Sequence, residues 1–193
     1  MATPKVGNKA PVFKGICTGE GNVDLSKLKG KKVVLYFYPK DSTPGCTTEG
    51  QNFRDLYKAF KKEGALIFGL SRESLKSHEN FKAKQSFPFE LISDPDEKIC
   101  NQYDVIKEKS MYGRKYMGID RSTFLIDEKG KLVQEWRKVK VTGHAQEVLD
   151  TIKSMKYNLF WKRFRPRIDY GFDKCCQWNG KKEPPETPNT TEK

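Results

Sequence analysis

Apolar residues along the chain follow two alternating patterns. Short runs that are apolar on both faces predict buried strands, whereas apolar residues repeated every three or four positions predict helices with one buried face. Residues 33–38 form the strongest apolar run and predict a central strand covered on both sides, which Pro39 ends. The apolar residues from Phe53 to Phe60 recur at helical spacing and predict a helix over 44–62.

The same patterns place the remaining elements. Further strands are predicted at 12–17, 22–25, 65–70, 89–92, 122–126 and 132–137. Further helices are predicted at 74–85, at 94–103 with Asp94 as its cap, and from 144 to about 155. Residues 107–118 are polar and contain glycine, so we expect a loop there. The element order predicts an α/β domain that resembles the thioredoxin-like fold, with a central mixed sheet flanked by helices and an N-terminal β extension.

Composition divides the chain into a domain and an extension. The 193 residues suffice for one domain plus an appendage. We expect the domain at 1–155 and a basic, aromatic extension at 156–193, which ends in a disordered tail rich in Pro, Glu, Thr, Asn and Lys. The stretch 157–167 interleaves aromatic and basic side chains. It could dock on the domain or another subunit, which we favour, or on an anionic membrane or nucleic acid.

Charge and cysteine content exclude several classes of protein. The formal net charge is +12, but the basic residues are spread along the chain, which favours a solvated surface over a nucleic-acid site. No apolar run approaches the ~18 residues of a membrane span. The N-terminus lacks an apolar signal segment, so we expect a cytoplasmic, reducing location. The 5 cysteines include no Cys-x-x-Cys, and the 2 histidines, His78 and His144, show no metal-ligand spacing. We therefore expect both histidines to be structural or at the surface, and we expect no metal and no other cofactor.

The candidate chemistry lies where the central strand runs into the next helix. Cys46 falls in the first turn of that helix, where unpaired backbone N–H groups and the helix dipole favour an anion. A thiolate is the nucleophilic form of cysteine. Thr43 can aim its hydroxyl at the same point, and Pro39 and Pro44 stiffen and shield the loop.

The motif around this cysteine resembles that of a known family. Pro39-x-x-x-Thr43-x-x-Cys46 matches the peroxiredoxin active-site pattern. The longer segment 37–49, Phe-Tyr-Pro-Lys-Asp-Ser-Thr-Pro-Gly-Cys-Thr-Thr-Glu, is similar to the peroxiredoxin Q or bacterioferritin comigratory protein subfamily. The resemblance covers roughly residues 6–155 and includes Arg121 directly before a predicted strand, as well as the segment 93–96.

This resemblance implies a thiol-dependent peroxidase that reduces hydrogen peroxide and organic hydroperoxides and protects against oxidative stress. Cys46 would be the peroxidatic cysteine, which becomes a sulfenic acid. Arg121 would stabilise the thiolate and the charge that develops on the leaving oxygen. Thr43 and the backbone N–H groups of Gly45 and Cys46 would bind the substrate.

The resemblance also implies supporting residues and partners. Pro39 would pack over the site. Glu49, one helical turn after Cys46, would orient Arg121, or would serve only as a carboxylate that complements the helix dipole. The reductant would be thioredoxin, glutaredoxin or a low-molecular-weight thiol, and the protein would be a monomer or weak dimer.

The chain departs from this subfamily in its second, resolving cysteine. Many members carry it five residues after the first, where this chain has Gln51, and others carry it in the next helix, where residues 80–86 contain none. We expect Cys17 to be structural and Cys100 to lie in the core. The remaining candidates for a resolving role are Cys175, Cys176 and, less favoured, Cys100. We therefore expect a one-cysteine-like scheme in which an external thiol attacks the sulfenic acid.

Two other functions stay open. A thioredoxin-like disulfide oxidoreductase is disfavoured because the turn carries one cysteine rather than two. A non-enzymatic thiol redox switch, whose basic extension binds nucleic acid or membrane, is the alternative from a different class.

Overall fold

A seven-stranded mixed sheet forms the centre of the computed structural model, which describes residues 3–19, 21–111 and 114–163, with side chains up to Met155 except at 111 and 114. The strand order is β2-β1-β5-β4-β3-β8-β9. Its strands are β1 (Lys14–Cys17), β2 (Gly21–Asp24), β3 (Lys32–Phe37), β4 (Ala65–Ser71), β5 (Glu90–Ser93), β8 (Ser122–Ile126) and β9 (Leu132–Trp136). A short 3-10 helix, Leu25–Leu28, follows β2.

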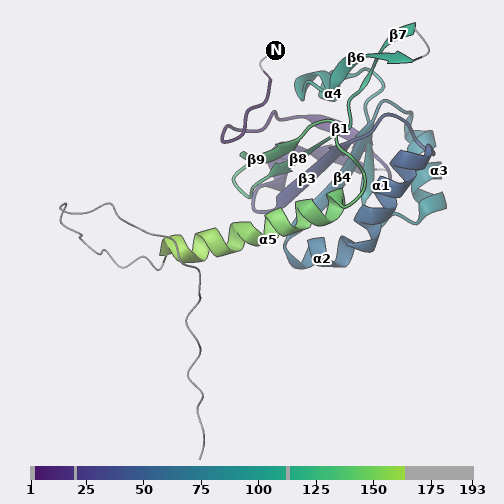
Figure 1. Cartoon of the computed structure of the whole chain (residues 1–193). Helices are drawn as coiled ribbons and strands as arrows, with labels where there is room; N and C mark the ends of the chain where they lie inside the picture. Colours follow the sequence, from purple (N-terminus) through teal and green to yellow (C-terminus); the bar gives the residue numbers. More distant parts are fainter. Residues whose placement is uncertain (1–2, 20, 112–113, 164–193) are drawn as a thin grey trace, which may run out of the picture.

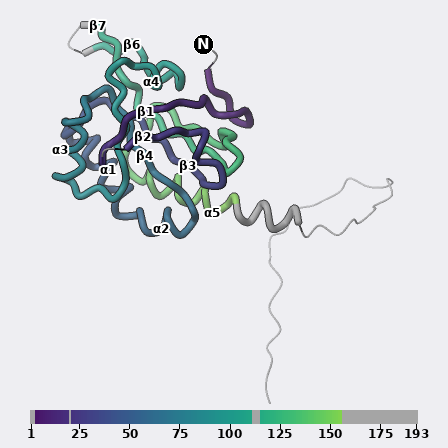
Figure 2. The backbone as a smooth tube through the Cα atoms, turned by 180° about the vertical axis from the view of Figure 1, so that it is seen from behind, coloured from purple at the N-terminus to yellow at the C-terminus, as the bar shows by residue number. Residues whose placement is uncertain are grey.

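The direction of the strands decides which face each helix covers. Strands β3, β4 and β5 are parallel neighbours in chain order, so right-handed crossovers put their connecting helices on one face. Those helices are α1 (Pro44–Asp55), α2 (Tyr57–Lys62) and α3 (Leu75–Gln85), and α5 (His144–Arg163) joins them. After β5 the chain returns across the sheet to β8, which pairs with β3 on the side away from β4. Helix α4 (Lys98–Gln102) and the N-terminal segment lie on the other face of the sheet (Figures 1 and 2).

Side chains of β3 alternate between two apolar clusters, one on each face of the sheet. Val33, Leu35 and Phe37 join the cluster beneath α4 and the N-terminal segment. Val34, Tyr36 and Tyr38 join the cluster beneath the four helices of the opposite face. Burial of each such side chain contributes about 1.5–3 kcal/mol, so β3 is held rigidly on both sides. The predicted central strand and the mixed, helix-flanked sheet are confirmed.

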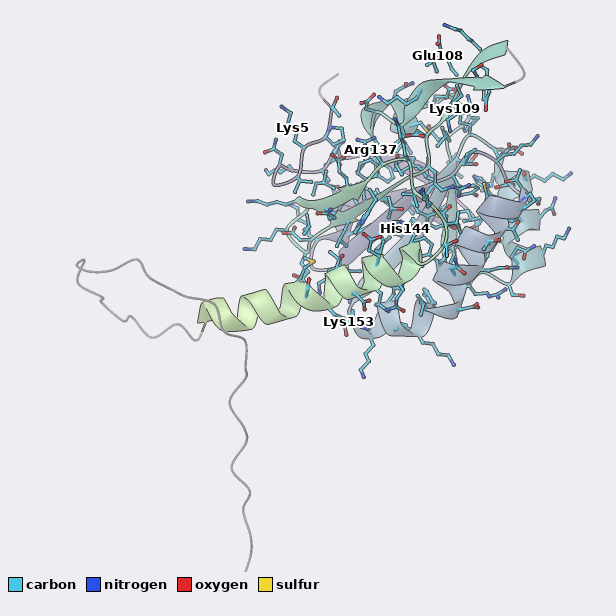
Figure 3. The ribbon with its side chains drawn as sticks, viewed as in Figure 1. Lys5, Glu108, Lys109, Arg137, His144 and Lys153 are labelled. Atoms are coloured by element: carbon cyan, nitrogen blue, oxygen red, sulfur yellow. The ribbon has the colours of Figure 1, made fainter. Side chains whose placement is uncertain are left out.

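The loop predicted at 107–118 is wrong. Strands β6 (Ile106–Met111) and β7 (Arg114–Ile119) form a separate antiparallel hairpin beyond the main sheet (Figure 1). Its cross-strand contacts include an ion pair of 3.1 Å between Lys115 Nζ and Glu108 Oε1. Glu108 and Lys109 are seen on β6 in Figure 3. The hairpin carries few buried side chains, so its sequence lacks the alternation that marks a half-buried strand.

Three helix boundaries also differ from the prediction. The helix expected at 44–62 divides at Leu56 into α1 and α2. The helix expected at 94–103 begins only at Lys98. Asp94 lies before the helix, but its carboxylate accepts the backbone N–H of Cys100 in the first turn, as the expected cap would. Helix α5 continues to Arg163, past the domain boundary expected at 155.

The division into domain and extension stays a prediction. Residues 164–193, with Cys175, Cys176 and the tail expected to be disordered, lie outside the described residues. Among the residues that the structure describes, no helix is long and apolar enough to cross a membrane.

Candidate active site

Cys46 lies where β3 ends and α1 begins. Thr43 has extended backbone angles and caps the helix, and Pro44 takes its first position, so Cys46 is the third helical residue. The first intrahelical bond joins Thr47 N to Thr43 O at 2.8 Å. The N–H groups of Gly45 and Cys46 precede that bond and point along the helix axis toward a ligand at the N-terminus. These donors and the helix dipole favour an anion at the sulfur.

Arg121 reaches this sulfur from the neighbouring strand. Strand β8 runs antiparallel to β3, with Ser122 opposite Phe37, so the residue before β8 lies beside the end of β3. Nη2 of Arg121 is 3.2 Å from Sγ of Cys46. Cys46 is only 2% exposed, so little water screens this interaction. The positive charge of the guanidinium therefore acts on the sulfur at short range.

Glu49 lies one turn after Cys46 and binds the same guanidinium. Its Oε2 accepts a hydrogen bond from Nη1 of Arg121, in the arrangement that an orienting role requires. Glu49 is 1% exposed, and burial raises its pKa to about 7 against the lowering effect of Arg121. Burial lowers the pKa of Arg121, but Glu49 and Cys46 outweigh burial and raise it above its ordinary value. The guanidinium is thus fixed in place and permanently charged.

Thr43, Pro39 and Gly45 come from the loop and helix start that carry Cys46. The hydroxyl of Thr43 donates to the carbonyl of Lys40 at 3.1 Å, which leaves its lone pairs to accept a hydrogen bond from a substrate O–H group. Pro39 is half-buried in the loop after β3. A Cβ at Gly45 would lie 3.5 Å from Nη2 of Arg121, so a longer side chain there would crowd the guanidinium.

Behind the loop lies a polar cluster that the sequence analysis missed. The carboxylate of Asp41 accepts hydrogen bonds from Tyr38 and Ser77 and contacts the imidazole of His78. His78 is fully buried, so its expected structural role fits its position. His144, at the first turn of α5 (Figure 3), is also buried and bonds Thr123 Oγ1 at 2.8 Å. Burial lowers the pKa of His144 to about 4, so it is neutral at pH 7.

Comparison with known proteins identifies the family of this arrangement. The model of the AhpC/TSA family matches residues 6–135. The chain belongs to that family. Peroxiredoxin Bcp of Xanthomonas campestris pv. campestris is 60% identical over 137 residues, which cover 71% of this chain and 86% of the relative. Peroxiredoxin Bcp of Bacillus subtilis is 49% identical over 153 residues, which cover 79% and 98%.

Solved structures agree with the sequence relatives. Xanthomonas campestris peroxiredoxin Q matches with a TM-score of 0.71 and 54% identity, covering 74% of this chain and 90% of that one. A cysteine-to-serine variant of Xylella fastidiosa PrxQ matches with a TM-score of 0.77 and 43% identity, covering 81% and 99%. The resemblance to the peroxiredoxin Q subfamily and the thioredoxin-like fold are thereby confirmed. The chain is a peroxiredoxin, an enzyme that reduces peroxides at the expense of a thiol.

The other described cysteines of this peroxiredoxin lie away from the site. Cys17 and Cys100 are buried at 3% and 0% exposure. Both belong to the apolar cluster on the face of the sheet opposite Cys46, so the structure does not bring Cys100 to the sulfur it was to resolve. Gln51, at the usual place of a resolving cysteine, donates instead to Oε1 of Gln85 on α3 at 2.9 Å. Within the described ranges, no group of His, Cys, Asp or Glu could hold a metal ion.

Proposed function

We propose that Cys46 is the peroxidatic cysteine of a one-cysteine-like peroxiredoxin that reduces hydrogen peroxide and organic hydroperoxides. The observation that carries this proposal is the 3.2 Å approach of Arg121 Nη2 to Cys46 Sγ at the N-terminus of α1. One solved relative, the bacterioferritin comigratory protein of Xanthomonas campestris, has alkyl peroxide reduction activity, which supports organic hydroperoxides as substrates.

The first step transfers one oxygen atom from the peroxide to the thiolate. The sulfur of Cys46 attacks the terminal oxygen of R–O–OH, an S–O bond forms and the O–O bond breaks. Sulfur is oxidised by two electrons to sulfenic acid, and the leaving RO⁻ takes a proton from solvent to give an alcohol, or water when R is hydrogen. Arg121 and the N–H groups of Gly45 and Cys46 donate to the peroxide oxygens as charge develops on them. Thr43 accepts from the peroxide O–H.

The second step returns the sulfenic acid to the thiolate. A thiol attacks the sulfur and releases water, and a second thiol then reduces the resulting mixed disulfide. Gln51 offers no sulfur at the usual resolving position, and Cys100 lies across the sheet. An external thiol, supplied by thioredoxin, glutaredoxin or a small thiol, therefore completes the cycle. We further propose a monomer or weak dimer in a reducing, cytoplasmic setting.

Membership of the family disfavours the two other functions considered from sequence. A disulfide oxidoreductase needs a second cysteine in the turn, and Cys46 has none in its helix. A purely non-enzymatic switch would not require an arginine in contact with the sulfur. The contact partner of the stretch 157–167 stays a prediction.

The test follows the oxidised cysteine directly. The protein is treated with one equivalent of hydroperoxide, and its intact mass is measured with and without dimedone. We expect a dimedone adduct on Cys46, and a Cys175→Ser/Cys176→Ser double variant should keep most turnover with external thiol. A stoichiometric disulfide from Cys46 to either extension cysteine, with turnover lost in the double variant, would replace the one-cysteine scheme with a two-cysteine one.

A further inference from the structure

A buried carboxylate lies in the loop that leads into the active site. Asp41 comes two residues before Thr43, between β3 and α1, and its side chain is 5% exposed. It accepts hydrogen bonds from the hydroxyls of Tyr38 at 2.8 Å and Ser77 at 2.7 Å. Nδ1 of His78 lies 2.9 Å from its Oδ2. These contacts connect the loop to Tyr38, directly after β3, and to α3.

The partner histidine has acceptors at both ring nitrogens. His78 is fully buried, and its Nε2 lies 3.2 Å from the carbonyl of Ile92 on β5. The imidazole thus lies between the loop and β5, with one ring nitrogen facing each. Burial raises the pKa of Asp41, but the hydrogen bonds from His78, Ser77 and Tyr38 outweigh it and hold this pKa below its ordinary value. A buried carboxylate and a donating imidazole therefore join the loop to the helix.

The backbone between Asp41 and Thr43 needs such an anchor. Ser42 has a φ of +57°, in the left-handed region that residues other than glycine rarely occupy. A conformation of this kind persists only where its surroundings hold it. On one side Asp41 is fixed by its three partners, and on the other the hydroxyl of Thr43 donates to Lys40 O. If Asp41 lost its partners, Ser42 could relax and Thr43 would lose its fixed position before the first turn of α1.

We propose that Asp41, held by His78, is a positioning residue that aims the hydroxyl of Thr43 at the peroxide. This inference rests on the proposed function of Thr43. The described bonds of the carboxylate end on Tyr38, Ser77 and His78, so Asp41 acts through the loop and not on Cys46. It should affect the reaction with peroxide and leave the nucleophilicity of the thiolate unchanged.

A double-mutant cycle tests whether Asp41 acts through Thr43. The full-length parent, Asp41→Asn, Thr43→Val and the double variant are compared by their second-order rate constants with hydrogen peroxide. Alkylation of Cys46 by iodoacetamide, followed by peptide mass, is measured in parallel. We expect Asp41→Asn to slow the peroxide reaction by about 10- to 100-fold and alkylation by less than about threefold. In the Thr43→Val background, Asp41→Asn should cost less than about threefold more, because the hydroxyl it aims is gone.

A matched control uses another carboxylate bound by the same helix. Glu90 on β5 pairs with Lys82 on α3 at 2.5 Å, outside the active-site loop. Glu90→Gln should leave the rate constant with peroxide within about twofold of the parent value. The substitution removes an ion pair of α3 but leaves the contacts of Asp41 unchanged. Where Asp41→Asn does not fold, Ser77→Ala removes one of its three bonds, and a smaller loss confined to the peroxide reaction is expected.

Three results would overturn the inference. Equal slowing of alkylation and peroxide reduction would show a general loss of the site. Losses that multiply in the double variant would show that Asp41 acts independently of Thr43. An unchanged rate in Asp41→Asn, while Thr43→Val is slow, would refute the role of Asp41 alone. An unchanged rate in Thr43→Val would instead refute the proposed function of Thr43, so the two failures are distinguishable.

Discussion

Cys46 and Cys100 are two buried thiols in the first turns of two helices, yet their electrostatic surroundings are opposite. Cys46 is 2% exposed and Cys100 is 0% exposed. The sulfur of Cys46 lies 3.2 Å from a guanidinium nitrogen of Arg121. Cys100 lies beside the carboxylate of Asp94, which binds its backbone N–H at 2.8 Å. Burial and the charge of Asp94 both raise the pKa of Cys100 far above its ordinary value.

The comparison shows that burial alone does not decide which of the two cysteines is suited to act as a nucleophile. Desolvation disfavours a thiolate at both positions. At Cys46 a guanidinium contacts the sulfur directly, whereas the largest charge effect at Cys100 comes from the carboxylate of Asp94. Helix α4 has 5 residues and ends at Gln102, so it also provides a weaker dipole than the 12-residue α1.

Serine substitution of each cysteine should give the largest contrast. Cys46→Ser should lower peroxide turnover by at least about 1,000-fold with the fold intact, because a serine hydroxyl is not ionised at neutral pH. Cys100→Ser should keep the rate within about threefold but lower the free energy of unfolding by about 1–3 kcal/mol, since its hydroxyl is buried. Stopped-flow rates and urea unfolding measure the two effects. Turnover by Cys46→Ser near that of the parent would refute the assignment.

Arginine-to-lysine substitutions should show that geometry counts as well as charge. Arg121→Lys should slow the reaction with peroxide by about 10- to 100-fold, because an ammonium cannot supply the planar fork of donors. Arg137→Lys is the matched control. Its guanidinium lies 4.7 Å from the Phe124 ring centroid and donates to two backbone carbonyls away from Cys46. The control should change the second-order rate constant by less than about twofold. Equal effects of the two substitutions would remove Arg121 from the site.

The smallest expected effect concerns the carboxylate that lies near Cys46 itself. The pKa of Glu49 rises from 4.5 to about 7 on folding. Between these values the native state binds more protons than the unfolded state, so the free energy of unfolding falls as pH rises from about 5 to 7. We expect this pH-dependent loss, up to about 3 kcal/mol, to be absent in Glu49→Gln. Urea unfolding of both proteins at several pH values measures it. A parent whose stability changes with pH no more than that of Glu49→Gln would show that Glu49 is ionised throughout.

The sequence allowed the central strand and the cysteine turn to be predicted because both depend on local signals. An apolar run predicts a strand buried on both faces, and the Pro-Gly-Cys segment predicts a helix start. Neither prediction requires knowledge of the topology. The contact between Cys46 and Arg121 could not be predicted from such local signals. It arises from the antiparallel pairing of β8 with β3, and the motif resemblance alone pointed to it.

The errors and omissions have physical causes too. Hairpin β6-β7 has mostly exposed side chains and thus no apolar alternation to detect. The break at Leu56 leaves the apolar spacing unchanged, because Phe53 and Phe60 on either side join one cluster. The importance of Asp41 depends on His78, 37 positions away, so a single polar residue in a loop gave no sign of it.

Cys46 and Arg121 lie 75 positions apart in the chain, and this separation also bears on how the protein is made. A chain emerging from the ribosome exposes Cys46 long before the strand that brings Arg121 has been synthesised. Until β8 pairs with β3, the sulfur has no guanidinium beside it. Completion of the sheet therefore brings the positive charge of Arg121 to the sulfur. On the proposed function, an unfinished chain thus lacks the contact that would make Cys46 reactive toward oxidants.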